Sequence, residues 1–229
     1  MRNFRNLKIL ALIVSALFAL EIILRTGTVL GSIFMIALPD QTFETDEGSI
    51  NIGLFFVGLL SLFELALRVV LIIVFLIFVN RGFKNLHAFG ILRSEFRPVS
   101  AVVWWFIPIF NFWMPFKIMS ELWNASDPEL ELDRNAVPPG KSAPETILFW
   151  WLAFIFGSIA GRISGKMFDA ARLKYFPVAS LVSAILLGVS AALAIGIVRG
   201  IAARQEARIS QFDRTEPPAP PTFDDETSV

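Results

Sequence analysis

Two apolar stretches of the chain each contain an acid and a base four residues apart. Glu21 and Arg25 lie in one, Glu64 and Arg68 in the other, and both sets read E-x-x-L-R. On a helix this spacing puts the two side chains on one face, one turn apart. A charge inside a membrane helix costs about 2.5–3.5 kcal/mol on insertion scales, so these groups are expected to pair. Two interpretations remain open: the four charges fix the register of two helices, or they relay protons or ions.

The helices that carry these charges are expected to run antiparallel, because only a short polar loop connects them. When residues are counted inward from the helix ends that share a membrane face, Glu21 comes to nearly the same depth as Arg68. By the same count Arg25 comes level with Glu64. We therefore predict two pairs between the helices, Glu21 with Arg68 and Arg25 with Glu64.

The stretch Pro98–Asp127 holds the other residues with unusual chemistry, and the rest of the chain is organised around it. It is apolar enough to lie in a membrane, yet Pro108 and Pro115 each remove a helical hydrogen-bond donor and Asn111 places an amide between them. Non-helical backbone at membrane depth persists only where protein or trapped water satisfies it. We expect the stretch to be buried among the other helices and to perform the specific binding of the protein. The candidate binding or structural residues are Trp105, Pro108, Asn111, Trp113, Pro115, Glu121 and Trp123.

A plainer interpretation of this stretch remains open, in which the prolines kink a packed helix and the tryptophans sit at the membrane interface. Glu121 distinguishes the two. A structural acid would pair with Lys117 one turn earlier, whereas a recognition acid would point into a cavity or the cytoplasm. The carbonyls of Trp104 and Asn111, each four residues before a proline, are expected to lose their helical donors and to face a ligand, water or a partner.

Composition places the chain among multi-pass α-helical membrane proteins. Its 229 residues are 55% hydrophobic and 17% charged, with a mean hydropathy of +0.64, and long apolar runs alternate with short polar segments. The formal net charge is zero, so nothing indicates nucleic-acid binding. The absence of cysteine excludes disulfides and cysteine nucleophiles, and a single histidine, His87, makes a histidine metal site implausible. We expect no cofactor and no bound metal, and the lipid bilayer as the first partner.

Apolar runs mark the elements that must position these residues. Spanning helices are expected at Leu7–Leu38, Ile52–Val79, Ile147–Ala160 and Pro177–Val198. The segments that join them are the acidic loop Gln41–Asn51, the basic interfacial segment Asn80–Arg97, the linker Glu129–Thr146 and the basic connector Arg162–Phe176. Residues 1–208 thus form one helical membrane domain with residues 98–127 as its central motif. A disordered, Pro-rich, acidic cytoplasmic tail is expected at residues 209–229.

The predicted fold class is an all-α integral membrane protein with four transmembrane helices plus a Pro-broken re-entrant or kinked segment. Five spanning helices are the alternative. The distribution of Lys and Arg favours the first, because both termini are then cytoplasmic and few basic residues lie outside. Those residues are Arg162, Lys166, Arg172 and Lys174. If Pro98–Asp127 crossed fully, more basic residues would lie outside.

The segment from Trp104 to Ser126 resembles the bacterial domain of unknown function 4328 family. That family has an aromatic-rich W-F-[IV]-P-x-x-N-x-x-x-P segment followed by E-[IL]-W-x-A-S. The matching positions are Trp105, Phe106, Pro108, Asn111, Pro115, Glu121, Trp123, Ala125 and Ser126. Weaker similarity extends the resemblance over most of residues 1–208, at Asn85, Trp150–Trp151 and Arg204–Gln205. The resemblance implies an uncharacterised multi-pass protein of the bacterial plasma (inner) membrane.

Small residues recur at every fourth position in the last two apolar runs. They are Gly157, Gly161 and Gly165 in one, and Ser180, Ala184, Gly188, Ala192, Gly196 and Gly200 in the other. Such grooves let two helix backbones approach closely. The grooves serve either the packing of these two helices or a seam in a homo-oligomer.

The sequence favours a scaffold or accessory protein that binds another membrane component through residues 98–127 and the basic segments. The alternative is a small transporter or channel-like protein that uses the broken helix and the four charges. A relay requires Glu21 or Glu64 to reach water, whereas a scaffold permits all four charges to be sealed. We expect no enzymatic activity, because no nucleophile with a base and no set of metal ligands is recognisable.

Overall fold

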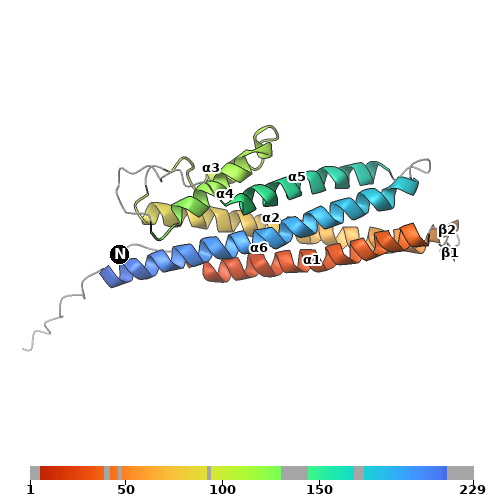
Figure 1. Cartoon of the computed structure of the whole chain (residues 1–229), viewed down its shortest axis with the longest axis horizontal. Helices are drawn as coiled ribbons and strands as arrows, with labels where there is room; N and C mark the ends of the chain where they lie inside the picture. Colours follow the sequence, from red (N-terminus) through yellow and green to blue (C-terminus); the bar gives the residue numbers. More distant parts are fainter. Residues whose placement is uncertain are drawn as a thin grey trace, which may run out of the picture.

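Four long helices run side by side and form the body of the molecule (Figure 1). They are α1 (Lys8–Ala37), α2 (Ile52–Ala88), α5 (Glu145–Lys166) and α6 (Phe176–Thr215). The computed structural model describes residues 6–38, 42–45, 48–91, 94–129, 144–167 and 173–215. Within these residues, four helices are long and apolar enough to cross a membrane. Large apolar side chains such as Ile9, Leu62 and Phe63 cover the outside of the bundle, as contact with lipid requires. The predicted fold class is confirmed.

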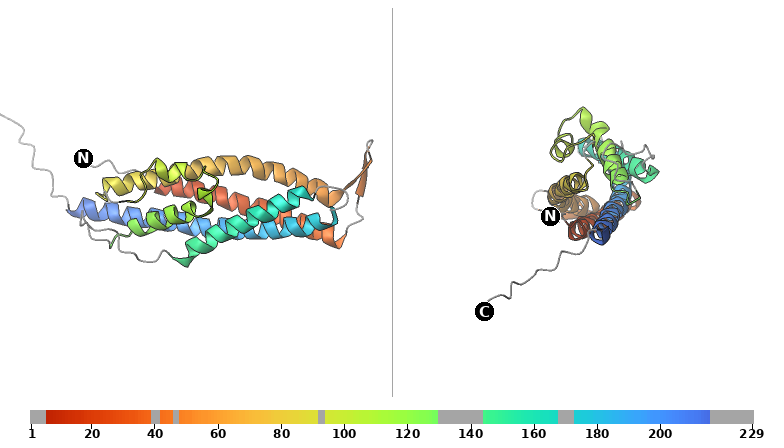
Figure 2. Two further views of the ribbon diagram at one scale, coloured as in Figure 1. Left: turned by 90° about the horizontal axis from the view of Figure 1, so that it is seen from above. Right: turned by 90° about the vertical axis from the view of Figure 1, so that its left-hand side faces the viewer.

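The helices pack in the order α2, α1, α6, α5. Helix α1 packs against both α2 and α6, and α5 packs against α6, whereas α2 and α5 have almost no close backbone contact. Lys8 Nζ lies 3.2 Å from Glu206 Oε1, so α1 begins beside the last turns of α6. We name this the terminal end of the bundle. The opposite end is the hairpin end, because two short strands lie there (Figure 2).

The connection between α1 and α2 is a β-hairpin where the sequence predicted a polar loop. Strand β1 (Thr42–Thr45) pairs antiparallel with β2 (Gly48–Asn51), with Thr42 opposite Asn51 and Thr45 opposite Gly48. Threonine, phenylalanine and isoleucine favour extended backbone, which outweighs the acidic composition of this segment. The side chain of Asn51 then caps α2 by accepting a hydrogen bond from the Leu54 amide at 3.1 Å.

Three helices extend beyond the predicted membrane spans. Helix α2 continues from Val79 to Ala88, α5 ends at Lys166 instead of Ala160, and α6 ends at Thr215 instead of Val198. The extensions of α2 and α6 bury side chains against the rest of the protein, so packing continues the helix where apolar composition ends. The predicted tail therefore begins too early, since residues 209–215 are helical. The remainder, residues 216–229, lies outside the described residues.

The central stretch leaves α2 at the terminal end and returns to the same end (Figures 1 and 2). It contains α3 (Ser100–Val103), a 3-10 turn η1 (Phe110–Phe112) and α4 (Met114–Ala125). At its start, Asn80 Nδ2 donates to the Pro98 carbonyl at 2.8 Å, and its end is held by the last turns of α6. The stretch therefore enters and leaves on one side, as the four-span arrangement requires.

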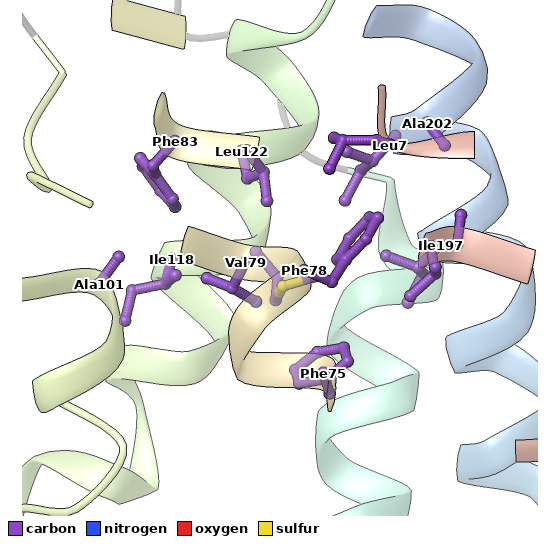
Figure 3. Close-up of a cluster of buried hydrophobic side chains, with 14 of the residues drawn as sticks. Leu7, Phe75, Phe78, Val79, Phe83, Ala101, Ile118, Leu122, Ile197 and Ala202 are labelled. Carbon is purple, nitrogen blue, oxygen red and sulfur yellow. The ribbon is translucent and has the colours of Figure 1, made fainter. Parts of the chain in front are cut away.

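The main hydrophobic core lies in the terminal half of the bundle (Figure 3). Its side chains come from α1, α2, α3, α4, α5 and α6. Among them are Phe78, Phe83, Ala101, Ile118, Leu122 and Ile197, all almost fully buried. The hairpin half has only a small cluster of Met35, Val57 and Phe176, and its other buried residues include Thr28, Ser32 and Glu64. Buried polar side chains also occur in the terminal half, where they include Asn85, Ser126, Gln205 and Arg208.

Candidate functional site

The four charges of α1 and α2 form one continuous chain of ion pairs. Arg68 Nη2 lies 3.3 Å from Glu21 Oε1, and Arg25 Nη1 lies 2.6 Å from Glu64 Oε2. The structure thus brings together both expected pairs. Arg25 Nη2 also lies 3.1 Å from Glu21 Oε1 within α1, which the sequence prediction did not include. Arg25 is therefore the hub, with one guanidinium nitrogen on each carboxylate.

Three of these four side chains are withdrawn from the surface. Glu21 and Arg25 are each 7% exposed and Glu64 is 5% exposed, whereas the Arg68 side chain is 36% exposed. Thr28 Oγ1 donates to Glu64 Oε1 at 2.8 Å, so both oxygens of this carboxylate have partners. Arg25 Nε is buried and has no hydrogen-bond partner among the residues that the structure describes. One donor of the hub thus remains unsatisfied.

A pocket of about 780 Å³, with charged and hydroxyl residues in its lining, opens beside this chain of charges, in the hairpin half between α2 and α5. Its charged lining residues are Arg25, Glu64, Arg68 and Arg162, and its hydroxyl residues are Thr28, Ser61, Ser158, Ser164, Ser180 and Ser183. Small residues widen the space, because a Cβ added at Gly58 or Gly165 would meet no atom within 4 Å. Among the described residues, no three acidic or histidine side chains gather closely enough to hold a metal ion.

The glycine groove of α5 packs against α6 and forms the back wall of this pocket. A Cβ at Gly157 would lie 2.8 Å from Leu187 Cγ, and one at Gly161 would lie 2.9 Å from Ser183 Oγ. Ser183 Oγ donates to the Gly157 carbonyl at 2.9 Å. The groove thus serves close contact between α5 and α6 at two of its glycines, while the third, Gly165, faces open space.

An aromatic cluster lies on the terminal side of the pocket. The Trp105 ring, from the turn after α3, lies 5.4 Å from Phe75 of α2 and 5.9 Å from Trp151 of α5 between ring centres. Trp151 stacks on Phe154, a pocket-lining residue, at 5.2 Å. Trp151 Nε1 also donates to the Phe112 carbonyl at 2.8 Å. The central stretch therefore fills the gap between α2 and α5 that the pocket leaves open in the other half.

The prolines of the central stretch act differently from the sequence prediction. Pro115 lies in the first turn of α4, where its missing N–H costs no helical hydrogen bond. Pro108 is an exposed turn residue, and the Asn111 amide donates to the Ile107 carbonyl at 2.8 Å within a turn. The stretch is thus broken into short helices, as predicted, although neither proline lies in a helix interior. Asn111 is half-buried and is not part of the pocket lining, and Trp113 is 41% exposed.

Glu121 follows neither predicted behaviour. Its Oε1 accepts from Ser94 Oγ at 2.8 Å and from the Glu95 amide at 2.7 Å, so it binds the loop after α2 and not Lys117. Its Oε2 is buried and has no hydrogen-bond partner in the described part of the chain. Burial raises the pKa of this carboxyl above its ordinary value, although the Ser94 hydrogen bond opposes the shift. Glu121 therefore fastens α4 to the loop after α2.

The other residues of the motif fasten the central stretch to α2 and α6. Gln205 Nε2 donates to Ser126 Oγ at 2.9 Å, and Gln205 Oε1 accepts from Asn85 Nδ2 at 2.9 Å. The Arg204 guanidinium lies 4.4 Å above the Trp123 ring. Arg208 Nη1 donates to the Ala125 carbonyl at 2.9 Å, a contact that sequence reasoning did not foresee. Part of the set behind the family resemblance thus meets in one intramolecular network, made of Asn85, Trp123, Ser126, Arg204 and Gln205.

Sequence reasoning also missed the pocket. Arg162 and the pocket serines lie on helices that are distant in the sequence. The only local signal was a hydroxyl residue repeated within otherwise apolar helices, as at Ser61 and Ser158.

Comparison with known proteins gives one match. A family model described as a domain of unknown function (DUF4328) matches residues 42–204, more than half of the chain. No curated protein and no solved structure matches. The matched span includes Glu64, Arg68 and Arg162, while Glu21 and Arg25 precede it.

Proposed function

Because the chain belongs to the DUF4328 family, whose description assigns no activity, we propose a function from the site: the protein is a small, non-enzymatic transporter that binds a polar solute between α2 and α5. This is the alternative that the sequence analysis left open, and the pocket now favours it. The observation that carries the proposal is that Arg25, Glu64 and Arg68 border an open pocket of about 780 Å³. The size falls within the range of ligand sites, about 300–1,000 Å³.

The energetic argument concerns the charged side chains that border an open pocket in a membrane. Charged side chains at membrane depth mark solute pathways and relays because they are costly to keep there. A protein that needed the four charges only to fix helix register would gain by sealing them between α1 and α2. Here Glu64 and two arginines line the pocket, and this placement supports a path for a solute.

The terminal side of the pocket supports a gated path. The aromatic cluster of Trp105, Trp151 and Phe75 lies on this side, and it rests partly on a re-entrant segment held to α5 by the Trp151–Phe112 hydrogen bond. A displacement of this segment would join the pocket to the terminal end. The positive-inside rule supports a cytoplasmic terminal end, so the pocket opens to the exterior of the plasma membrane.

Single cysteines in this cysteine-free chain test the path. Ser61→Cys lines the pocket, and Leu62→Cys, its neighbour on the lipid-facing side, is the matched control. A charged, membrane-impermeant thiol reagent should modify Ser61→Cys from the hairpin side and leave Leu62→Cys unmodified. Adding Trp151→Phe, which removes the hydrogen bond to Phe112, should raise modification of Ser61→Cys from the terminal side in inside-out vesicles. A Ser61→Cys protein that reacts from neither side would refute the pocket, and an unchanged terminal-side rate with Trp151→Phe would refute the gated path.

A second function, the scaffold favoured by the sequence, is supported by the tip of the central stretch. Phe106, Ile109 and Phe112 at this tip are 67%, 70% and 61% exposed. Such a surface suits contact with another membrane protein as well as with lipid. Photo-crosslinking from Ile109 in native membranes tests this: capture of one defined protein supports a scaffold, and crosslinks to lipid alone refute it. The network around Gln205 weakens the case, because it uses the motif residues within the chain.

A further inference from the structure

The pocket presents more positive than negative groups. Arg25, Arg68 and Arg162 line it, and the carboxylates near it are Glu64 and Glu21. Three guanidinium groups against two carboxylates leave a net charge of +1. Arg162 makes no ion pair or hydrogen bond with any residue that the structure describes, and it projects from the last turns of α5. The pocket therefore suits an anion.

The hydrogen-bonding groups of the pocket that remain available to a ligand also favour an anion. Both oxygens of Glu64 already accept bonds, and Glu21 Oε1 is shared by two arginines. The hydroxyl hydrogen of Ser61 goes to the Val57 carbonyl. The donors that remain include the guanidinium groups of Arg162 and of the partly exposed Arg68, and the hydroxyls of the lining serines Ser158, Ser164 and Ser180. Guanidinium groups match carboxylate and phosphate oxygens in geometry as well as charge.

The shape of the pocket indicates how the anion arrives. At about 30 Å³ per water, the space would hold about 25 waters, far more than a small inorganic anion needs. It lies in the gap between α2 and α5, which scarcely touch. Leu65 of α2 lines the pocket yet is 62% exposed, and Phe154 of α5 lines it and is 36% exposed. Apolar side chains thus border the gap where it meets lipid.

We propose that the pocket binds the anionic head of an amphiphile, a phosphate or carboxylate on an apolar chain, which enters sideways between α2 and α5. Arg68 and Arg162 bind the head, and Leu65 and Phe154 contact the start of the apolar chain. This inference rests on the proposed solute pocket and names the class of its ligand. A soluble anion shares the same head chemistry, so the test must separate the two sources.

The test measures protection of the Ser61→Cys thiol in the full-length protein, purified in a neutral detergent. A neutral maleimide is the reagent, so that the charge of the micelle does not change its local concentration. Three additions are compared: phosphatidylglycerol, phosphatidylcholine and soluble glycerol phosphate. We expect phosphatidylglycerol to slow the reaction at least fivefold and the other two to change it less than twofold.

Two charge variants provide the matched pair. Arg162→Gln in the Ser61→Cys background should abolish protection, whereas Lys166→Gln should retain it. Lys166 lies one turn further on the same helix, is also exposed, and does not line the pocket. Because Arg162 has no partner in the described residues, its loss leaves no acid uncompensated and the variant should fold, which size-exclusion chromatography checks.

Each other outcome overturns the inference in a distinct way. Equal protection by phosphatidylcholine would show that the head charge is not recognised. Protection by glycerol phosphate in place of the lipid would assign the site to a soluble anion. If no addition protects a thiol that still reacts, the anionic ligand is refuted and the solute pocket stands. If the thiol does not react at all, the pocket itself, and with it the proposed function, fails.

Discussion

Loss of the Arg25 side chain should be the most damaging single change among the four membrane charges. Arg25→Met removes the guanidinium that lies 3.1 Å from Glu21 and 2.6 Å from Glu64 while keeping most of the side-chain volume. Glu64 would then keep only Thr28 as a partner, in a position that is 5% exposed. Removing one partner of a buried ion pair costs about 3–5 kcal/mol, because the other charge stays buried. This is a large share of a typical folding free energy of about 5–15 kcal/mol.

Arg68→Met is the matched control for this prediction. The Arg68 side chain is 36% exposed and contacts Glu21 at 3.3 Å, and Glu21 keeps Arg25 when Arg68 is removed. A partly exposed pair with an alternative partner contributes little, about 1 kcal/mol or less. The two substitutions are chemically identical, so the difference between them isolates the hub position.

The assay is reversible unfolding of the purified protein in mixed micelles, followed by far-UV circular dichroism. Glu64→Gln in the Arg25→Met background should recover part of the lost free energy of unfolding, because it removes the charge that Arg25 had compensated while keeping an acceptor for Thr28. An Arg25→Met protein within about 1 kcal/mol of the unchanged protein would refute the reasoning. So would an Arg68→Met protein that is destabilised as much as Arg25→Met.

Three further predictions follow from the contacts. Glu121→Gln should abolish a pH dependence of the free energy of unfolding. Burial raises the pKa of Glu121 in the folded protein above its ordinary value of 4.5, so the protonated carboxyl stabilises the fold fully below pH 4.5. This stabilisation is lost as the pH rises through the folded pKa. Unfolding midpoints between pH 4 and 7 check this, and identical pH profiles for the two proteins would contradict it. Gln205→Ala should lower the free energy of unfolding by about 2–3 kcal/mol, because Asn85 and Ser126 are left with fewer hydrogen-bond partners. Glu206→Ala, which removes an exposed ion pair with Lys8, should lower it by less than about 1 kcal/mol in the same assay. Gly157→Val should destabilise the folded protein by about 1–3 kcal/mol, because the new side chain would collide with Leu187 of α6. Gly165→Val should have little effect, because its side chain would enter open space. Equal effects of the two substitutions would show that α5 does not pack against α6 at Gly157.

The pairing partners of the membrane charges could be predicted because they depend on local rules. Helical spacing places Glu21 beside Arg25 and Glu64 beside Arg68, and a short connection makes the two helices antiparallel. The cost of a bare charge in lipid then leaves few alternatives to pairing. The same reasoning did not reveal that Glu21 is shared between two arginines. A charge swap of Glu21 with Arg68 should therefore fail to restore stability, since the new arginine would lie beside Arg25.

The helix ends could not be read from apolar composition. Val79 and Val198 end the apolar runs, but α2 and α6 continue because Phe83 and Leu86 on one, and Ile201 and Arg208 on the other, are almost fully buried. Their burial depends on α4 and the loop beside it, which come from elsewhere in the chain. Hydropathy measures how well a segment suits lipid, so it does not predict how far a helix continues outside the membrane where it packs on protein.

The sequence by itself determined the membrane class, the four long apolar spans and the pairing of the charges, and it favoured a re-entrant path for residues 98–127 over a fifth span. Each of these follows from composition, helical period or the distribution of basic residues, which are properties of neighbouring positions. Only the tertiary structure decided that Glu121 binds the loop after α2, that Gln205 joins Asn85 to Ser126, and that a pocket lies open beside Arg25. The physical reason is that a pocket is the space between helices that fail to meet. Whether α2 and α5 meet is decided by how α1, α6 and the central stretch pack around them.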